Sequence, residues 1–470
     1  MQHLKIYFVL LQLQICYFSM DVTAKNSPLS LGTEKIGKLL MQYAFPAIVA
    51  MTASSLYNIT DSIFIGHGVG PLAIAGLAIT FPLMNLAAAF GAMIGVGAST
   101  LLSVRLGQKD YDTANNILGN VVTLNLILGL SYTFVMLLFL DPILIFFGAS
   151  ADTLPYAHDF MVIILCGNVI THMFMGLNAM LRSAGSPKKA MYATIFAVLI
   201  NIVLNPLFIF VFEWGIKGSA YATVIAQIIV LMWQLKLFND RNMFIHFRRG
   251  TFRLRSSIVK HSVSIGMAPF LMNAASCIIV VLINRGLMQH GGDMAVGAYG
   301  IVNRVAFFFI MIVIGLTQGM QPIAGYNYGA KNYSRVTDVF KKTVLGATIA
   351  LCVGTFIAEV FPHFVASLFT SDEQLIDMAV VGLRIVFMTY PIVGFQIVGS
   401  HLFQSIGMAN KAIFLSVSRQ VIFLIPFLLI FPYFWGINGV WFTMPTADVI
   451  ATFITFFVLM RQLHQFKKQA

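Results

Sequence analysis

Two copies of one short motif, Trp214-Gly-Ile-Lys-Gly218 and Trp435-Gly-Ile-Asn-Gly439, stand 221 residues apart and decide how the chain is organised. Two further pairs occur at nearly the same spacing. Gly107-Gln-Lys109-Asp-Tyr111 corresponds to Gly329-Ala-Lys331-Asn-Tyr333, and Ser150-Ala-Asp152-Thr-Leu154 corresponds to Ser371-Asp-Glu373-Gln-Leu375. Three pairs in the same order at one spacing indicate that the second half of the chain repeats the first.

The composition places this repeat in a membrane. The 470 residues are 59% hydrophobic and only 10% charged, and the mean hydropathy is +0.85. A soluble chain carries roughly 25% charged residues, and no ordinary core could hide this much apolar surface from water. These values exclude a soluble enzyme, a disordered protein and a secreted disulfide scaffold. The four cysteines are scattered, so neither a disulfide framework nor a zinc site is indicated.

Twelve apolar runs are long enough to cross a bilayer as helices, which takes about 20 residues each. They lack the alternation of barrel strands, so we predict an all-α integral membrane protein. Six spans per repeat is an even number, so both halves enter the membrane the same way round, as a parallel repeat of two pseudo-symmetric six-helix lobes. The runs are 39–66, 72–103, 116–140, 157–181, 190–212, 218–238, 258–287, 294–322, 338–361, 375–405, 411–434 and 438–460.

Charge then predicts the orientation of the twelve spans. The net charge of +12 comes from Lys and Arg in the loops that follow even-numbered spans and in the C-terminal tail. Loops after odd-numbered spans hold only Lys217 and Arg285 as basic residues. Because Lys and Arg collect in cytoplasmic loops, we expect both termini in the cytoplasm and the protein in the inner (plasma) membrane. The basic balance is thus topological and does not imply a nucleic acid partner.

The predicted divisions follow from this topology. An N-terminal segment covers 1–31, an N-lobe of helices 1–6 covers 32–238, and a basic cytoplasmic linker covers 239–257. A C-lobe of helices 7–12 covers 258–465, and 466–470 form a cytoplasmic tail. Met20 opens the polar stretch before the first span, so we interpret residues 1–19 as an over-extended start, with an interfacial amphipathic segment as the alternative.

Polar residues inside the spans are the candidates for function, because a charge at the bilayer centre costs about 2.5–3.5 kcal/mol on insertion scales. Asp61 lies on the first span with Tyr57 one turn earlier, so both share a face. Burial penalises the charged form of a carboxyl group, so Asp61 is predicted to bind and release a coupling proton. The alternative is that Asp61 lies close enough to Gly66 to reach water and has no role.

Spans five and six carry further polar pairs at one-turn spacing. Asn201 and Asn205 precede Pro206, whose missing N–H frees a carbonyl, and Thr223 precedes Gln227. Carboxamides beside a freed carbonyl suit a small hard cation, although Asn in a membrane also simply ties helices together.

In the second half, Arg304, Arg384, Arg419 and Asp448 lie within spans. Asp448 is expected to pair with one of the arginines, and Arg304 with Asp448 is the candidate ion pair or gate of the C-lobe.

Two longer stretches carry a family resemblance over residues 32–465. Gly315-Leu-Thr-Gln-Gly-Met-Gln-Pro-Ile-Ala-Gly-Tyr-Asn-Tyr-Gly-Ala-Lys331 and Arg182-Ser-Ala-Gly-Ser-Pro-Lys188 are very similar to signatures of the multidrug and toxic compound extrusion (MATE) transporters, nearest to their DinF-like and MepA-like bacterial branch. The resemblance implies export of organic cations or amphipathic drugs, driven by inward flow of H⁺ or Na⁺.

The resemblance also implies which residues act. Tyr57, Asp61, Asn201 and Thr223 match the residues of that branch, whereas Asn205 stands where the branch has a second acid. Asp61 is then the single titratable acid of the N-lobe cluster. The other four residues would bind substrate or, with Asp61, a sodium ion.

The chain is therefore predicted to be an ion-coupled multidrug antiporter working by alternating access, without a cofactor and as a monomer. A lipid-linked oligosaccharide flippase of the same superfamily is the alternative within transport, because Arg304 offers a basic group for pyrophosphate. A membrane-embedded enzyme is disfavoured, because no catalytic acids or histidines cluster in the sequence.

Overall fold

The computed structural model describes residues 28–469, and all regular elements of this part of the chain are helical. The first half contains η1 (Pro28–Gly32), α2 (Ile36–Gly68), α3 (Pro71–Gly107), α4 (Tyr111–Leu138), α5 (Leu140–Phe146), α6 (Leu154–Cys166), α7 (Asn168–Ser183), α8 (Pro187–Pro206), η2 (Leu207–Val211) and α9 (Gly215–Asn239). The second half contains α10 (Ser256–Gly329), α11 (Tyr333–Val360), α12 (Pro362–Ser367), α13 (Glu373–Phe387), α14 (Tyr390–Ser405), α15 (Ala409–Val417), η3 (Ser418–Leu424) and α16 (Ile425–Gln469).

The described helices account for twelve spans. Eight helical stretches are long and apolar enough to cross a membrane, and two more spans arise if each bent pair, α6 with α7 and α13 with α14, is one span. Two of the long stretches hold two spans each, because α10 breaks at Gly292 and α16 breaks at Gly436, where the backbone leaves the helical region. The twelve-helix prediction is therefore confirmed.

Two spans that the sequence predicts as continuous helices are bent in the structure. The chain turns by 54° between α6 and α7 and by 53° between α13 and α14. Gly167 separates the first pair, and glycine is a weak helix former. In the second pair Pro391 lies in the first turn of α14, where its missing N–H prevents a continuous hydrogen-bond ladder.

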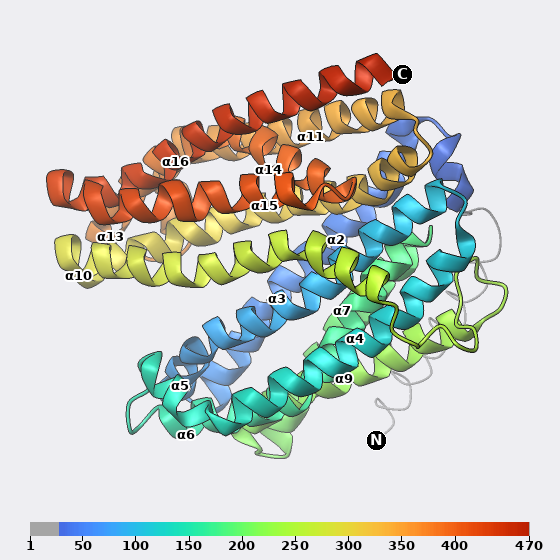
Figure 1. Ribbon diagram of the computed structural model, residues 1–470. Helices are drawn as coiled ribbons and strands as arrows, with labels where there is room; N and C mark the ends of the chain where they lie inside the picture. Colours follow the sequence, from blue (N-terminus) through green and yellow to red (C-terminus); the bar gives the residue numbers. More distant parts are fainter. Residues whose placement is uncertain (1–27, 470) are drawn as a thin grey trace.

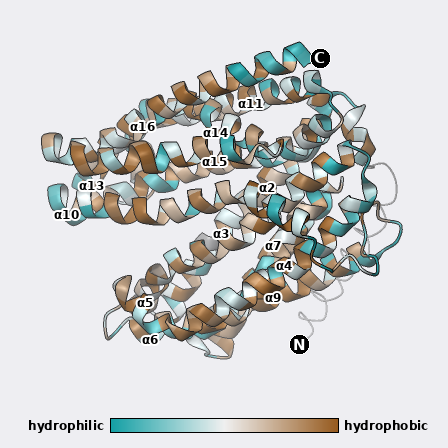
Figure 2. Ribbon diagram, in the orientation of Figure 1, coloured by the Kyte–Doolittle hydropathy of each residue, from teal (hydrophilic) through white to brown (hydrophobic). Residues whose placement is uncertain are grey.

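The helices form two groups, here called the N-lobe (α2–α9) and the C-lobe (α10–α16). Figure 1 shows the groups close together at the end where the C terminus lies and diverging toward the opposite end, where α5, α6 and α13 lie. In Figure 2 hydrophobic residues run along the helices, and hydrophilic residues gather in the connecting segments at the end of the C terminus. Large apolar side chains cover the outer faces, and Phe146, Phe457 and Leu429 are more than 60% exposed. Such faces require lipid rather than water around them.

The repeated motifs have matching conformations in the two lobes, which explains why the sequence repeats them. Gly215 and Gly436 both have φ 55°, a left-handed conformation that glycine adopts without steric cost. At the second glycine of the motif, a Cβ on Gly218 would lie 2.9 Å from the Phe208 carbonyl carbon, and Gly439 makes the same kind of approach to the Phe431 backbone. Each motif therefore turns the chain into the sixth span of its lobe and packs it against the end of the fifth.

The lobes meet through a reciprocal contact at the converging end. A Cβ on Gly107 would lie 2.8 Å from the carbonyl carbon of Tyr326, and one on Gly329 would lie 2.9 Å from the carbonyl carbon of Val104. Each glycine thus faces the residue three places before the other, as a two-fold relation requires. Gln321 adds bonds across the junction, since its Nε2 donates to Ser99 Oγ at 2.9 Å and Thr100 Oγ1 at 2.8 Å.

Replacing Gly329 with alanine is expected to lower the free energy of unfolding by about 1–3 kcal/mol, the usual effect of overpacking a close contact. Gly300→Ala is the matched control on the same helix, because its added methyl group meets no atom within 4 Å. The control should be neutral or stabilising by up to about 1 kcal/mol, as expected for Gly→Ala within a helix. Thermal unfolding of the purified proteins measures both, and equal midpoints for the two variants would contradict the close packing.

Candidate functional site

Three helices bring the predicted N-lobe residues together in two layers one helical turn apart. Asp61 and Tyr57 come from α2, Asn205 and Asn201 from α8, and Thr223 from α9. The five predicted residues therefore belong to one cluster, because pairs spaced four residues apart on facing helices meet layer by layer. The upper layer is formed around Asp61 and the lower around Tyr57.

In the upper layer Asp61 is 8% exposed and accepts two hydrogen bonds on one oxygen. The donors to Asp61 Oδ1 are Asn205 Nδ2 and Ser219 Oγ, the latter at 2.5 Å. Asn205 and Ser219 are fully buried. None of the ion pairs among the described residues includes Asp61. A carboxylate held only by neutral donors in a buried place requires a proton or a bound cation to compensate its charge.

In the lower layer Thr223 joins the other two residues. Tyr57 Oη and Thr223 Oγ1 are 2.8 Å apart, and Asn201 Nδ2 donates to Thr223 Oγ1 at 3.0 Å. On each of the three helices, the residue of this layer lies four positions, or one turn, from the residue of the upper layer. It supplies hydroxyl and carboxamide oxygens, the ligand types that hard cations prefer.

One acceptor of the cluster is left without a partner. Asn205 Oδ1 is buried and has no hydrogen bond to any described residue. The nitrogen of the same amide donates to Asp61 Oδ1, so the unused acceptor belongs to a group that is bound to the carboxylate. Among the described residues no group of three or more His, Cys, Asp and Glu side chains is arranged to hold a metal ion, so a site for a softer metal is not indicated.

The local backbone explains why Asn205 reaches Asp61. α8 ends at Pro206, and the π-helical turn η2 follows directly. Pro206 has no N–H to continue the α-helical ladder, and π-helical turns frequently mark functional sites. The helix continues through Pro206, and its hydrogen-bonding pattern changes to the π-helical one directly after this residue.

Ser219 is the residue of this site that the sequence interpretation missed. It lies one turn before Thr223 on α9, so the same one-turn rule could have found it. Gln227, predicted as the partner of Thr223 on that face, instead accepts a hydrogen bond from Thr171 of α7 at 2.5 Å. Gln227 therefore ties α9 to α7 and does not join the two layers.

The C-lobe holds a buried ion pair with a different partner from the one predicted. Asp448 on α16 lies 2.6 Å from Arg419 Nε, and its side chain is 4% exposed. Arg304 is exposed and takes part in none of the ion pairs among the described residues. The expectation that Arg304 pairs with Asp448 is wrong, because the carboxylate of Asp448 is bound by Arg419. Arg419 instead lies on the π-helical segment η3, where the guanidinium reaches α16.

Comparison with known proteins places this architecture in one family. The MatE family model matches residues 46–207 and 265–430, one stretch in each lobe. The multidrug export protein MepA of Staphylococcus haemolyticus (strain JCSC1435) is 26% identical over 424 residues, covering 90% of this chain and 93% of that protein. MepA of Staphylococcus aureus (strain MSSA476) is 25% identical over 411 residues, covering 87% of this chain and 90% of that protein.

Solved structures agree on the fold. An outward-facing structure of a multidrug resistance MATE family transporter of the MOP superfamily superposes with a TM-score of 0.89 at 24% identity, covering 95% of this chain and all of that one. A MOP superfamily transporter from Pyrococcus furiosus gives the same TM-score and coverage at 25% identity. The matched family model, the twelve spans and the two-lobe arrangement agree, and this multi-pass membrane protein belongs to the MatE family, whose members are transporters and not enzymes.

Proposed function

We propose that the protein is a secondary active multidrug antiporter that exports organic cations or amphipathic drugs in exchange for inward H⁺ or Na⁺. The observation that carries the proposal is Asp61, which is buried, bonded only by neutral donors and free of any described cationic partner. Its relatives named as multidrug export proteins support the substrate class.

One carboxylate can serve both halves of an exchange. An organic cation compensates the charge of Asp61 from one side of the membrane, and a proton or sodium ion compensates it from the other. Because either ligand neutralises the same group, binding of the coupling ion removes the attraction for the drug. In this scheme protonation of Asp61 releases the drug outward by changing the packing of α2, α8 and α9.

The orientation follows from the basic linker. The segment between Asn239 and Ser256 and the C terminus lie at the converging end of the lobes (Figure 1). By the positive-inside rule this end is cytoplasmic, so the described conformation, which diverges at the other end, is outward-facing. We assign the protein to the plasma membrane as a monomer in which the two lobes rock against each other.

Nothing in the arrangement favours the flippase alternative. Binding of a pyrophosphate needs basic groups whose charge is not already compensated, and Arg419 is compensated by Asp448.

The test uses proteoliposomes and a fluorescent organic cation under an imposed proton gradient and then an imposed sodium gradient. Transport driven by the proton gradient alone would mean that Asp61 couples as a single acid. Transport driven by sodium would mean that Asn205 coordinates the ion through its amide oxygen. Absence of transport under both gradients would reject the proposal.

Replacing Asn205 with aspartate is expected to confer or strengthen sodium-driven transport, by about tenfold or more in apparent sodium affinity. The substitution places a second carboxylate in contact with Asp61, and two carboxylates bind a hard cation more strongly than one with an amide. Asn178→Asp is the matched control, because it adds an acid in the same lobe beside Arg182, whose Nη1 lies 3.3 Å from Asn178 Oδ1. Sodium dependence that shifts equally in both variants would contradict a sodium site at Asp61.

A further inference from the structure

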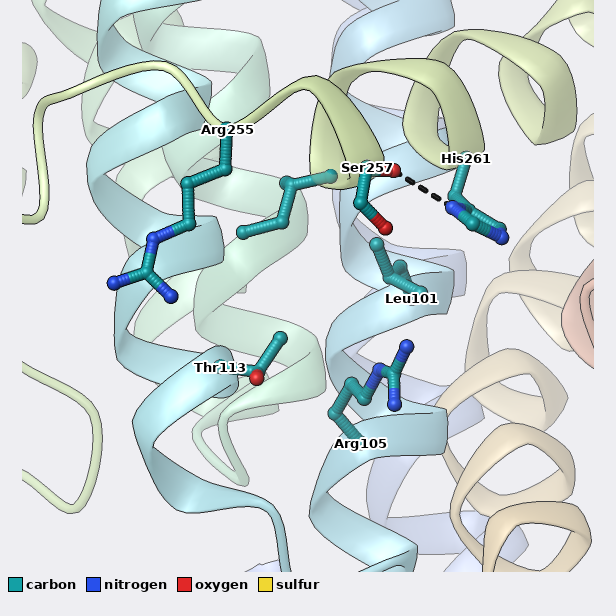
Figure 3. A pocket seen from close by; sticks show the side chains of 7 residues that line it. Leu101, Arg105, Thr113, Arg255, Ser257 and His261 are labelled. Carbon is teal, nitrogen blue, oxygen red and sulfur yellow. Dashed lines mark hydrogen bonds between the residues drawn. The ribbon is translucent and has the colours of Figure 1, made fainter.

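A separate pocket lies between the two lobes at the end that carries the basic linker. Its volume is about 140 Å³, comparable with about five water molecules at roughly 30 Å³ each. Its polar lining comes from the end of α3, the start of α4 and the start of α10 (Figure 3): Arg105, Thr113, Arg255, Ser257 and His261. None of these residues belongs to the Asp61 cluster.

Arg105 lines this pocket, and its guanidinium group retains one unused donor. In Figure 3 its side chain extends from α3 toward Ser257 of α10, with Thr113 of α4 nearby. Arg105 Nη1 donates to Gln108 Oε1 at 3.1 Å and lies 3.7 Å from Asp110 Oδ2. Its Nε is buried and has no hydrogen-bond partner among the described residues. A buried guanidinium N–H without an acceptor is a costly arrangement that a bound acceptor would relieve.

The start of α10 supplies further donors on the other side of the pocket. The N-cap residue Arg255 makes no side-chain cap, so the first N–H groups of the helix keep no intrahelical or capping acceptor. The Arg255 backbone N–H donates to Asn120 Oδ1 at 2.9 Å. No hydrogen bond or ion pair joins the Arg255 guanidinium to the described part of the chain. His261 Nδ1 lies 2.6 Å from the carbonyl oxygen of Ser257, which holds the first turn of α10 in place.

The charge around the pocket is strongly positive. The only acidic side chains in the connecting segment and first turn of α4 are Asp110 and Asp112, and Asp112 already pairs with Arg248 at 3.4 Å. The lining itself holds two arginines, Arg105 and Arg255, and no acidic side chain. A phosphate group matches this setting, because it is anionic and offers several acceptor oxygens to guanidinium, hydroxyl and helix N–H donors.

We infer that this pocket is a binding site for a phosphate group, formed by Arg105, Arg255, Ser257 and the first turn of α10. Its place at the ends of the spans favours the headgroup of an anionic phospholipid, since basic pockets between spanning helices at the cytoplasmic surface hold such headgroups. Because α3 and α4 belong to the N-lobe and α10 to the C-lobe, the bound headgroup bridges the lobes where they converge.

The test titrates the full-length protein in detergent micelles with phosphatidylglycerol, phosphatidylcholine and inorganic phosphate, and counts bound molecules by native mass spectrometry. Phosphatidylglycerol should bind more tightly than phosphatidylcholine. Arg105→Gln combined with Arg255→Gln should weaken its binding by about tenfold or more, because charge-assisted hydrogen bonds are the strong ones. The charge-matched control combines Arg241→Gln with Arg249→Gln, two exposed arginines of the same linker, and should change binding by less than about twofold.

A second variant tests the inference independently, in case the double arginine variant does not fold. Ser257→Phe fills the pocket without altering any charge, and it should also abolish preferential phosphatidylglycerol binding. Inorganic phosphate that binds with the same dependence on Arg105 and Arg255, while phosphatidylglycerol does not, would assign the site to a free phosphate. Equal phosphatidylglycerol binding by the pocket variants and the linker control would overturn the inference.

Discussion

Asp61→Asn is expected to reduce ion-driven export to the level of protein-free liposomes while the protein still folds. Asparagine has nearly the same size and can still accept hydrogen bonds from Asn205 and Ser219, but it carries no charge and takes up no proton. Because the wild-type carboxylate is buried without a described cationic partner, its removal should change the free energy of unfolding by no more than about 1 kcal/mol or raise it. Transport of a fluorescent organic cation and thermal unfolding measure the two effects.

Asp159→Asn provides the control for the loss of an acid in the same lobe. Asp159 is 41% exposed and pairs with Lys217 at 3.2 Å, so its contribution to stability is within about 1 kcal/mol and its neutralisation should leave export unchanged. Full export by the Asp61→Asn protein under the same gradient would reject Asp61 as the coupling group.

Arg419→Met is expected to lower the free energy of unfolding by about 3–5 kcal/mol, the usual effect of removing one partner of a buried ion pair. The substitution leaves Asp448, 3% exposed, without its partner at 2.6 Å. Adding Asp448→Leu should restore most of the lost stability, because the double variant no longer contains an uncompensated buried charge. Thermal unfolding of the two single variants and the double variant forms the cycle that measures the coupling.

Arg304→Met is the matched control for this cycle. Arg304 lies in the same lobe, is exposed and belongs to none of the ion pairs of the described residues, so its loss should change stability by less than about 0.5 kcal/mol. If Arg419→Met is no more destabilising than Arg304→Met, the pair with Asp448 has no structural role.

Five residues of the candidate site could be predicted from one-turn spacing of polar residues. Tyr57, Asp61, Asn201, Asn205 and Thr223 could be selected from the sequence because polar side chains are rare in spans and those four residues apart share a face. That rule describes one helix at a time. Which helices lie side by side, and at what height, depends on packing between the helices of the N-lobe, so Ser219 was identified only when α9 was placed against α2 and α8.

The partner of Asp448 in the C-lobe could not be predicted from the sequence for the same reason. Arg304, Arg384 and Arg419 look alike in the sequence, since each is a lone arginine in an apolar run. The choice of Arg419 as partner of Asp448 depends on the rotation of η3, where π-helical geometry shifts the direction of the side chains that follow.

The sequence by itself determined the membrane class, the twelve spans, the repeat and five residues of the Asp61 cluster, because hydropathy, motif spacing and the cost of intramembrane charge act locally along the chain. The tertiary structure alone decided the pairing of Arg419 with Asp448, the place of Ser219 beside Asp61, and the meeting of α3 and α10 at Gly107 and Gly329. These features depend on contacts between residues far apart in the chain, and such contacts are fixed only when helices of known rotation and height are packed against one another.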